Sequence, residues 1–156
     1  MNQYYTLALI LFLMIFSACQ GNEDEVDTQA PTIDMAFDGA FPQQCEILQR
    51  GETNTIQALF ADNFELGSYS IDVHHNFDHH THSTDVTECT REPVKAPVNP
   101  WLLIEGHEIP AGQKSHHMTF PLSVPADVDT GHYHLMIKLT DKAGWQTIKG
   151  IAIKVH

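Results

Sequence analysis

Apolar and polar residues alternate along several short segments of this chain, and no segment shows a sustained helical period. These segments span 56–61, 66–74, 119–125, 132–139 and 148–155, and the last of them is rich in β-branched residues. Turn-forming residues separate them at 127–131 and 140–145. Short strands of this kind, interrupted by glycines and prolines, are typical of stacked sheets. The pattern therefore predicts an all-β fold, an antiparallel β-sandwich.

The alternation also predicts which side chains face the core, because successive residues of a strand point to opposite faces. The apolar positions of two strands would face inward: Ile71, Val73, Tyr133, Leu135 and Ile137. The positions between them would face outward: Asp72, His74, His132 and His134. Several polar, chemically versatile side chains are thus expected on the outside of the sandwich.

The amino-terminal segment has the features of a secretory signal. Residues 7–16 form an apolar run too short to span a bilayer as a stable helix, and small residues follow it. The Phe-Ser-Ala-Cys sequence that ends at Cys19 resembles the lipobox of bacterial lipoproteins. This resemblance implies that residues 1–18 are a lipoprotein signal peptide and that Cys19 carries lipid. The alternative is an uncleaved membrane anchor.

An acidic stretch with almost no apolar side chains follows Cys19 and predicts a flexible, disordered tether over residues 19–30. Acidic residues directly after a lipidated cysteine also resemble the surface-export signal of Bacteroidota lipoproteins. This resemblance implies an outer-membrane lipoprotein of the cell envelope, held to the membrane by its lipid and facing either the periplasm or the cell surface. Residues 31–156 remain for one domain with its own core.

The net charge of −12 belongs entirely to the chain after the signal, because residues 1–18 contain no charged side chain. An acidic surface repels the phosphate backbone, which argues against nucleic acid as a partner. It favours cations near the protein but does not name one.

Two cysteines, Cys45 and Cys89, remain once Cys19 carries lipid. Thiols are normally oxidised in the expected compartment, which predicts a Cys45–Cys89 disulfide. Closing a loop of this length gives a stabilisation on the order of 4 kcal/mol. The alternative is that both thiolates bind a metal ion together with histidines.

Histidine is concentrated in two places. Five of the eleven histidines lie between residues 74 and 82, and His132 and His134 form a spaced pair far downstream. Neutral imidazole is the commonest protein ligand for zinc and copper, and histidines at i and i+2 of a strand point to one face. For the scattered histidines we expect ordinary surface or core roles: His107, His116, His117 and His156.

Several motifs resemble those of bacterial immunoglobulin-like and cadherin-like domains. They occupy residues 30–33, 61–66, 109–112, 131–135 and 141–145. Residues 74–82 and 131–145, together with the lipobox, are more narrowly similar to a family of Bacteroidota lipoproteins called domain of unknown function 4625. The resemblance implies an immunoglobulin-like sandwich at the cell envelope, and it implies no activity.

An immunoglobulin-like topology would make the strand ending at His74 a neighbour of the strand beginning at Gly131. The loop after His74 would then bring further imidazoles over the shared outer surface, and among these we favour His80 and His82. The candidate metal ligands are His74, His79, His80, His82, His132 and His134. Two carboxylates, Asp72 and Asp78, are expected either to supply an oxygen ligand or to orient an imidazole by a hydrogen bond.

Imidazoles with a nearby carboxylate suit zinc or copper better than calcium or magnesium, which prefer oxygen ligands. We favour zinc, with copper next; Met136 lies on the histidine face and could bind copper, although packing is the commoner role of such a methionine. We expect no catalytic residues, because the sequence has no Gly-x-Ser-x-Gly motif, phosphate-binding glycine loop or His-Glu-x-x-His motif.

These observations predict a lipid-anchored metal-binding protein of the cell envelope, not an enzyme. Two alternatives remain. One is an immunoglobulin-like adhesion or recognition module whose histidines are incidental. The other is a metal-dependent enzyme whose ion keeps an open coordination position.

Overall fold

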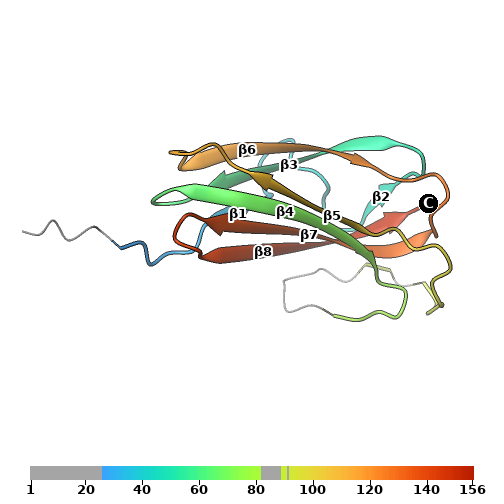
Figure 1. Cartoon of the computed structure of the whole chain (residues 1–156). Coiled ribbons are helices and arrows are strands. Elements are labelled where there is room, and N and C mark those ends of the chain that lie inside the picture. The colour runs from blue at the N-terminus through green and yellow to red at the C-terminus, as the bar shows by residue number, and fades with distance from the viewer. Residues whose placement is uncertain (1–25, 82–88, 91) are drawn as a thin grey trace, which may run out of the picture.

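Eight strands form two sheets that pack face to face in the computed structural model, which describes residues 26–81, 89–90 and 92–156 (Figure 1). The smaller sheet has the order β1 (Thr32–Asp34), β3 (Thr53–Ala61), β6 (Ser115–Ser123). The larger sheet has the order β2 (Glu46–Leu48), β8 (Gln146–Val155), β7 (Gly131–Asp141), β4 (Leu66–His75), β5 (Leu103–Glu108). The described residues contain no helix, so the prediction of an all-β sandwich is confirmed.

The sheets are mostly antiparallel, whereas we expected antiparallel pairing throughout. The exception is β2, which pairs with β8 in parallel. A tight hairpin forces two strands to run antiparallel, but β2 is separated from β8 by most of the chain and joins it only at the sheet edge. The long connection between β2 and β8 therefore does not determine whether the two strands run parallel or antiparallel.

The five segments predicted from alternation correspond to β3, β4, β6, β7 and β8, with ends shifted by a few residues. The prediction missed β1, β2 and β5. The first two have three residues each, and most residues of β5 are exposed. No alternating apolar face marks such strands in the sequence, because they bury little surface.

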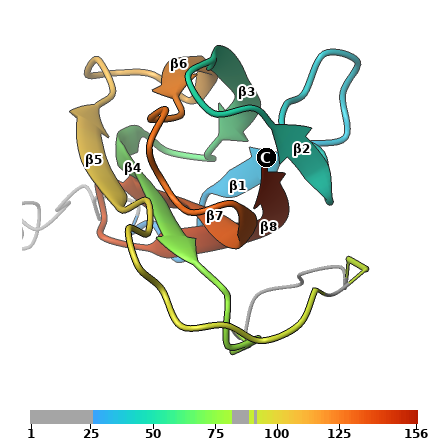
Figure 2. The same ribbon diagram turned by 90° about the vertical axis from the view of Figure 1, so that its right-hand side faces the viewer.

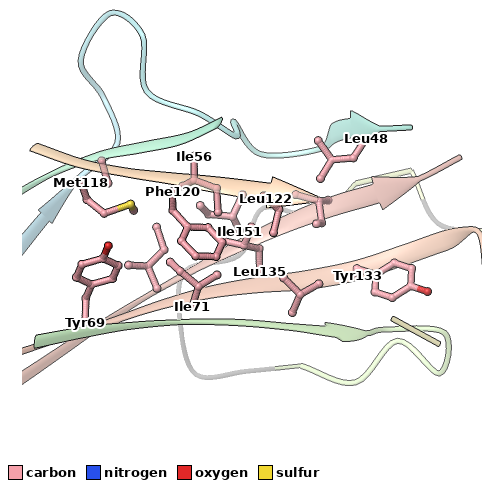
Figure 3. Close-up of a cluster of buried hydrophobic side chains, with 14 of the residues drawn as sticks. Leu48, Ile56, Tyr69, Ile71, Met118, Phe120, Leu122, Tyr133, Leu135 and Ile151 are labelled. Carbon is pink, nitrogen blue, oxygen red and sulfur yellow. The ribbon is translucent and has the colours of Figure 1, made fainter. Parts of the chain in front are cut away.

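The core lies between the two sheets and consists of the side chains that alternation turned inward (Figure 3). Buried residues of the larger sheet include Tyr69, Ile71, Val73, Tyr133, Leu135, Ile137 and Leu139. Buried residues of the smaller sheet include Ile56, Ala58, Phe60, Met118, Phe120 and Leu122. Each fully buried side chain of the Leu, Ile or Phe type contributes roughly 1.5–3 kcal/mol to folding stability. The choice of which residues of β4 and β7 face inward is therefore strongly fixed.

The pairing of β4 with β7 positions the candidate site. The two strands are antiparallel neighbours, as the expected sandwich topology required. Their register places His74 opposite His134 and Asp72 opposite Met136. Because the inward phase of both strands is fixed by the core, these four side chains belong to the outer face of the larger sheet.

The described parts of the segment between β4 and β5 lie on the outer side of the larger sheet (Figure 2). Phe77 and Trp101 anchor its described ends, since both rings are buried in the core. Lys95 places its Nζ 4.5 Å from the centre of the Phe77 ring. The histidines of this segment are therefore carried by a chain that is held at both ends.

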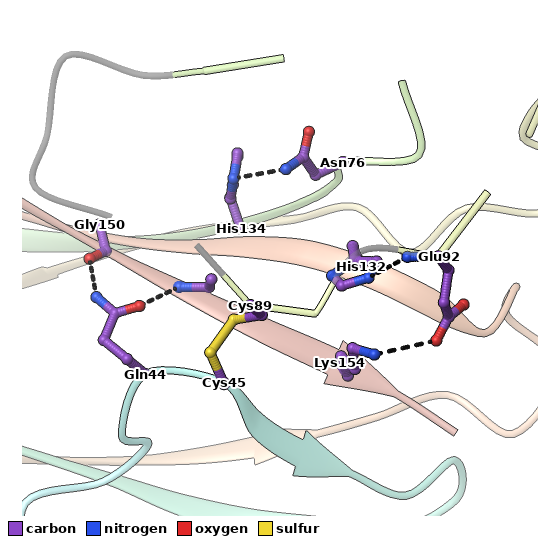
Figure 4. The surroundings of a disulfide bond; sticks show 10 residues. Gln44, Cys45, Asn76, Cys89, Glu92, His132, His134, Gly150 and Lys154 are labelled. Carbon is purple, nitrogen blue, oxygen red and sulfur yellow. Dashed lines mark hydrogen bonds and ion pairs between the residues drawn. A yellow bond between two sulfur atoms is a disulfide. The ribbon is translucent and has the colours of Figure 1, made fainter. Parts of the chain in front are cut away.

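A disulfide ties this segment to the opposite edge of the sheet. Cys89 is bonded to Cys45, which directly precedes β2, as Figure 4 shows. The predicted disulfide is thus confirmed, and its two cysteines are 44 positions apart in the sequence. The alternative of two thiolate metal ligands is wrong, because sulfurs that are bonded to each other are not thiolates.

Residues 1–25, 82–88 and 91 lie outside the described part of the chain. The expected signal peptide over residues 1–18, the lipidation of Cys19 and the candidate ligand His82 therefore stay predictions. Within the part that is described, no helix is long and apolar enough to cross a membrane.

Tyr133 provides a test of how the segment before β5 is attached to the core. Its buried hydroxyl donates to the Asp129 carbonyl (2.7 Å) and accepts from the Trp101 N–H (3.2 Å). We expect Tyr133→Phe to lower the free energy of unfolding by about 1–3 kcal/mol, because both backbone groups lose their partner.

The measurement is guanidinium denaturation, and Tyr69→Phe is the matched control. Tyr69 is a second core tyrosine whose hydroxyl makes no hydrogen bond within the described residues. Its loss should change stability by less than about 0.5 kcal/mol. Equal losses in the two variants would contradict the role given to the Tyr133 hydroxyl.

Candidate metal centre

Two candidate ligands, His74 and His134, face each other across the β4–β7 pair. Their rings are nearly perpendicular, with an interplanar angle of 83° and centroids 5.6 Å apart. His134 points away from the core and is nevertheless only 3% exposed. The segment after β4 covers it, with Asn76 hydrogen-bonded to its ring and His80 beside it.

A turn directly after β4 brings His80 back over the sheet. The His79 N–H donates to the Asn76 carbonyl (3.3 Å), and His79 has a left-handed backbone with φ of 59°. Histidine is among the residues that tolerate this conformation, and it reverses the chain direction. The His80 ring consequently stacks on His74, with centroids 5.6 Å apart, and lies 5.2 Å from the His134 ring.

These three histidines form the candidate metal site. One ring nitrogen of each lies within 4.8 Å of those of the other two. Zinc–nitrogen bonds are about 2.0–2.1 Å long, so two ligands of a tetrahedral ion lie roughly 3.4 Å apart. A closure of up to about 1.4 Å would form such a shell, and rotation of the loop side chain His80 can supply part of it.

Two carboxylates orient two of the three rings. His74 Nδ1 lies 2.5 Å from Asp72 Oδ1, and His80 Nδ1 lies 2.6 Å from Asp78 Oδ1. Both contacts join residues i and i+2, and the one from His80 holds the pKa of Asp78 below its usual value. A histidine that donates Nδ1–H to a carboxylate presents the lone pair of Nε2, the form that binds a metal ion. Asp72 and Asp78 therefore make the contacts that an orienting role requires, and that role stays a prediction.

The third ring has an amide partner that the sequence analysis missed. Asn76 Nδ2 lies 2.9 Å from His134 Nε2 (Figure 4). An amide nitrogen only donates, so His134 Nε2 accepts and its lone pair is engaged; a metal ion would bind at this nitrogen only by displacing Asn76. Asn76 follows His74 by two residues just past the end of β4, and this position over the sheet was the one available signal for it.

His79 and His132 lie outside this group of three. The His132 ring is 6.0 Å from that of His79, and its Nε2 accepts from the Glu92 N–H at 3.1 Å. Its cross-strand partner is Lys154, whose Nζ lies 3.3 Å from Glu92 Oε1 (Figure 4). Burial lowers the pKa of His132, and the neighbouring Lys154 lowers it further. The positive charge of Lys154 next to His132 disfavours a cation at this ring.

Other histidines lie at the far end of the sandwich, as expected for residues outside the site. The His107 ring stacks on Tyr69 with centroids 5.0 Å apart, and the His116 ring is 6.3 Å from the same tyrosine. Burial lowers the pKa of His116, and the adjacent His117 lowers it further. These residues pack against aromatic side chains and do not take part in the group of three.

The lowered pKa of His116 predicts a contribution to acid sensitivity. In the unfolded chain the imidazole gains a proton near its ordinary pKa of about 6.5, while in the folded protein it gains one only at lower pH. The unfolded state therefore binds more protons, and stability falls as the pH drops below about 6.5.

Denaturation at a series of pH values measures this contribution. We expect His116→Gln to lose less stability than the natural protein between about pH 7 and pH 5, because the variant lacks the titrating group. Identical pH dependence of the two proteins would contradict the burial of this imidazole.

Comparison with known proteins gives a family and two distant structural likenesses. The chain resembles a superoxide reductase (neelaredoxin) from Ignicoccus hospitalis with a TM-score of 0.42 and 12% identity, over 82% of this chain and 81% of that one. It resembles the sporulation control protein Spo0M from Bacillus subtilis with a TM-score of 0.43 and 12% identity, over 83% and 50% of the respective chains. No curated protein matches the chain in sequence. The family profile that matches covers residues 17–156, so the chain belongs to the family described as domain of unknown function (DUF4625).

Proposed function

We propose that this domain binds a divalent transition metal ion, zinc or copper, through His74, His80 and His134. One observation carries the proposal: three imidazoles from two strands and a loop place a nitrogen each within 4.8 Å of the others. Two of these rings are hydrogen-bonded to carboxylates through Nδ1, which is the arrangement that prepares an imidazole for metal binding.

The ligand type favours zinc or copper over harder cations. Imidazole nitrogen is a ligand for zinc and copper, whereas calcium and magnesium prefer oxygen. Asp72 and Asp78 add negative charge next to the rings without occupying the position between them. This charge offsets part of the ion's positive charge, so the site suits a divalent cation.

A bound metal ion also explains why the three rings are held together. If two of the rings were protonated at this separation, they would repel each other by at least about 3.5 kcal/mol at an effective dielectric constant of 20. Neutral rings avoid this repulsion, and an ion between them converts their proximity into a favourable interaction. A surface that only recognises a protein would gain no comparable stabilisation from placing three imidazoles this close together.

We further propose that binding takes place at the cell envelope, on a domain anchored through lipid at Cys19. The Cys45–Cys89 disulfide supports an oxidising compartment. The lipobox-like sequence before Cys19 and the acidic residues after it support the anchor. In this setting the domain would capture or buffer zinc or copper, and it would not catalyse a reaction.

Calorimetric titration with zinc chloride tests the site directly, using protein prepared without a histidine tag. We expect one ion per chain, and we expect His74→Ala and His134→Ala each to weaken binding by at least about 100-fold, because each removes a direct ligand.

The matched control is His107→Ala, which removes an imidazole that packs on Tyr69 at the far end of β4. Zinc affinity should not change in this variant. Equal affinity in the natural protein and in both ligand variants would rule out the site. If the protein bound zinc stoichiometrically and also converted a substrate in a reaction that chelators abolish, the alternative of a metal-dependent enzyme would be favoured instead.

A second test concerns the carboxylate that orients His74. We expect Asp72→Asn to weaken zinc binding by about 10- to 100-fold, because a neutral amide no longer holds the Nδ1 proton as strongly. The control is Glu105→Gln, since Glu105 lies 3.5 Å from the His107 ring outside the site. If both substitutions had the same effect, Asp72 would have no specific role in metal binding.

A further inference from the structure

Three carboxylates meet at the end of the sandwich opposite the histidine group. Asp27 precedes β1, Asp62 lies between β3 and β4, and Asp141 ends β7. One oxygen of each lies within 4.8 Å of those of the other two. His134 and Asp141 are on the same strand, and seven residues of strand span roughly 23 Å, so the two groups are separate.

The carboxylates of Asp62 and Asp141 are each held by two backbone N–H groups that donate to a single oxygen. Oδ1 of Asp62 accepts from the N–H groups of Phe64 (2.8 Å) and Glu65 (2.7 Å). Oδ1 of Asp141 accepts from those of Gly144 (2.6 Å) and Trp145 (2.8 Å). With one oxygen fixed in a turn, the other oxygen of each carboxylate has a defined direction.

Asp27 is held in the same way, although it lies in the segment expected to be a tether. Its Oδ1 accepts from the Gln29 N–H and from Asn63 Nδ2, both at 3.1 Å. Its carbonyl oxygen accepts from Trp145 Nε1, also at 3.1 Å. Asp27 is therefore attached to both loops that carry the other two carboxylates.

The second oxygens of all three carboxylates are shielded from solvent and have no hydrogen-bond partner among the described residues. Asp27 and Asp141 are only 8% and 4% exposed. No lysine or arginine nitrogen in the described ranges lies within 4.0 Å of them, and Lys114 donates to the Asn63 carbonyl instead. A buried carboxylate oxygen without a donor or a cation is costly, and three together repel one another.

We propose that these three carboxylates bind a calcium ion. The site offers oxygen ligands only, and calcium takes six to eight oxygens at 2.3–2.6 Å in a flexible arrangement. Carbonyl oxygens or water complete such a shell. Magnesium demands a stricter octahedral geometry, and zinc prefers the imidazoles at the other end of the domain.

Calcium at this position would fasten the chain where it enters the domain. Asp27 comes before the first strand, so its carboxylate links the incoming segment to the β3–β4 and β7–β8 connections. The ion would thereby set the direction in which the amino-terminal segment leaves the sandwich. This structural role is independent of the metal proposed for the histidines.

Calorimetric titration of chelator-treated protein with calcium chloride tests the proposal. We expect one calcium ion per chain with a Kd of about 10⁻⁴ M, the range of extracellular calcium modules. Asp62→Asn and Asp141→Asn should each weaken binding more than about tenfold. In both variants the amide Oδ1 still accepts the backbone N–H groups, while the amide nitrogen replaces the oxygen that binds the ion.

Asp129→Asn is the matched control, because Asp129 also accepts two backbone N–H bonds, from Val98 and Asn99, but lies before β7 at the opposite end. Its calcium affinity should equal that of the natural protein, as should that of His74→Ala. No binding at millimolar calcium, binding that survives both site variants, or equally tight binding of magnesium would overturn the proposal.

Thermal unfolding separates a calcium ligand from a merely structural aspartate. Calcium should raise the Tm of the natural protein and leave that of Asp141→Asn unchanged. In chelator the variant should be at least as stable as the natural protein, because one of three repelling charges is gone. A variant that is destabilised equally with and without calcium would contradict the proposal.

Discussion

The antiparallel pairing of β4 with β7 is the constraint on which the sandwich and the histidine group both depend. Burial of alternate side chains fixes the phase of each strand, and the register then sets which outward residues meet. A shift of one residue would move His74 and His134 into the core and expose Ile71 and Leu135. The apolar core therefore maintains the spacing of two imidazoles on the opposite face of the sheet.

The third imidazole depends on a different kind of constraint. His80 is on a loop, and a turn with a left-handed His79 directs it back over the sheet. The disulfide and the buried rings of Phe77 and Trp101 restrict the segment that carries it. Of the three proposed ligands, two lie on paired strands and one lies on a loop, a combination that could adapt to an ion without distorting the sheet.

Much of this arrangement follows from the sequence, and the remainder depends on contacts between distant segments. Alternation predicted the five long strands and their inward faces, because these depend on burial alone. That the strands carrying His74 and His134 are neighbours was implied by the resemblance to immunoglobulin-like domains. Alternation could not choose among the loop histidines, since turn geometry decides that His80 joins the site while His79 does not. The pairing of Asn76 with His134 also depends on that turn.

The carboxylate group shows the same limit more clearly. Asp62 and Asp141 stand in ordinary turn sequences, and Asp27 stands in an acidic segment that reads as a tether. Nothing local distinguishes them from other acidic residues. Their convergence appears only once β3 and β7 are placed in facing sheets and Trp145 binds the Asp27 carbonyl.

The most direct test of the histidine site is a crystal structure of the zinc-loaded protein with anomalous diffraction at the zinc edge. The account predicts one strong peak among His74, His80 and His134, about 2.0–2.1 Å from a nitrogen of each ring. A peak bound by other residues, or none among these three rings, would contradict it.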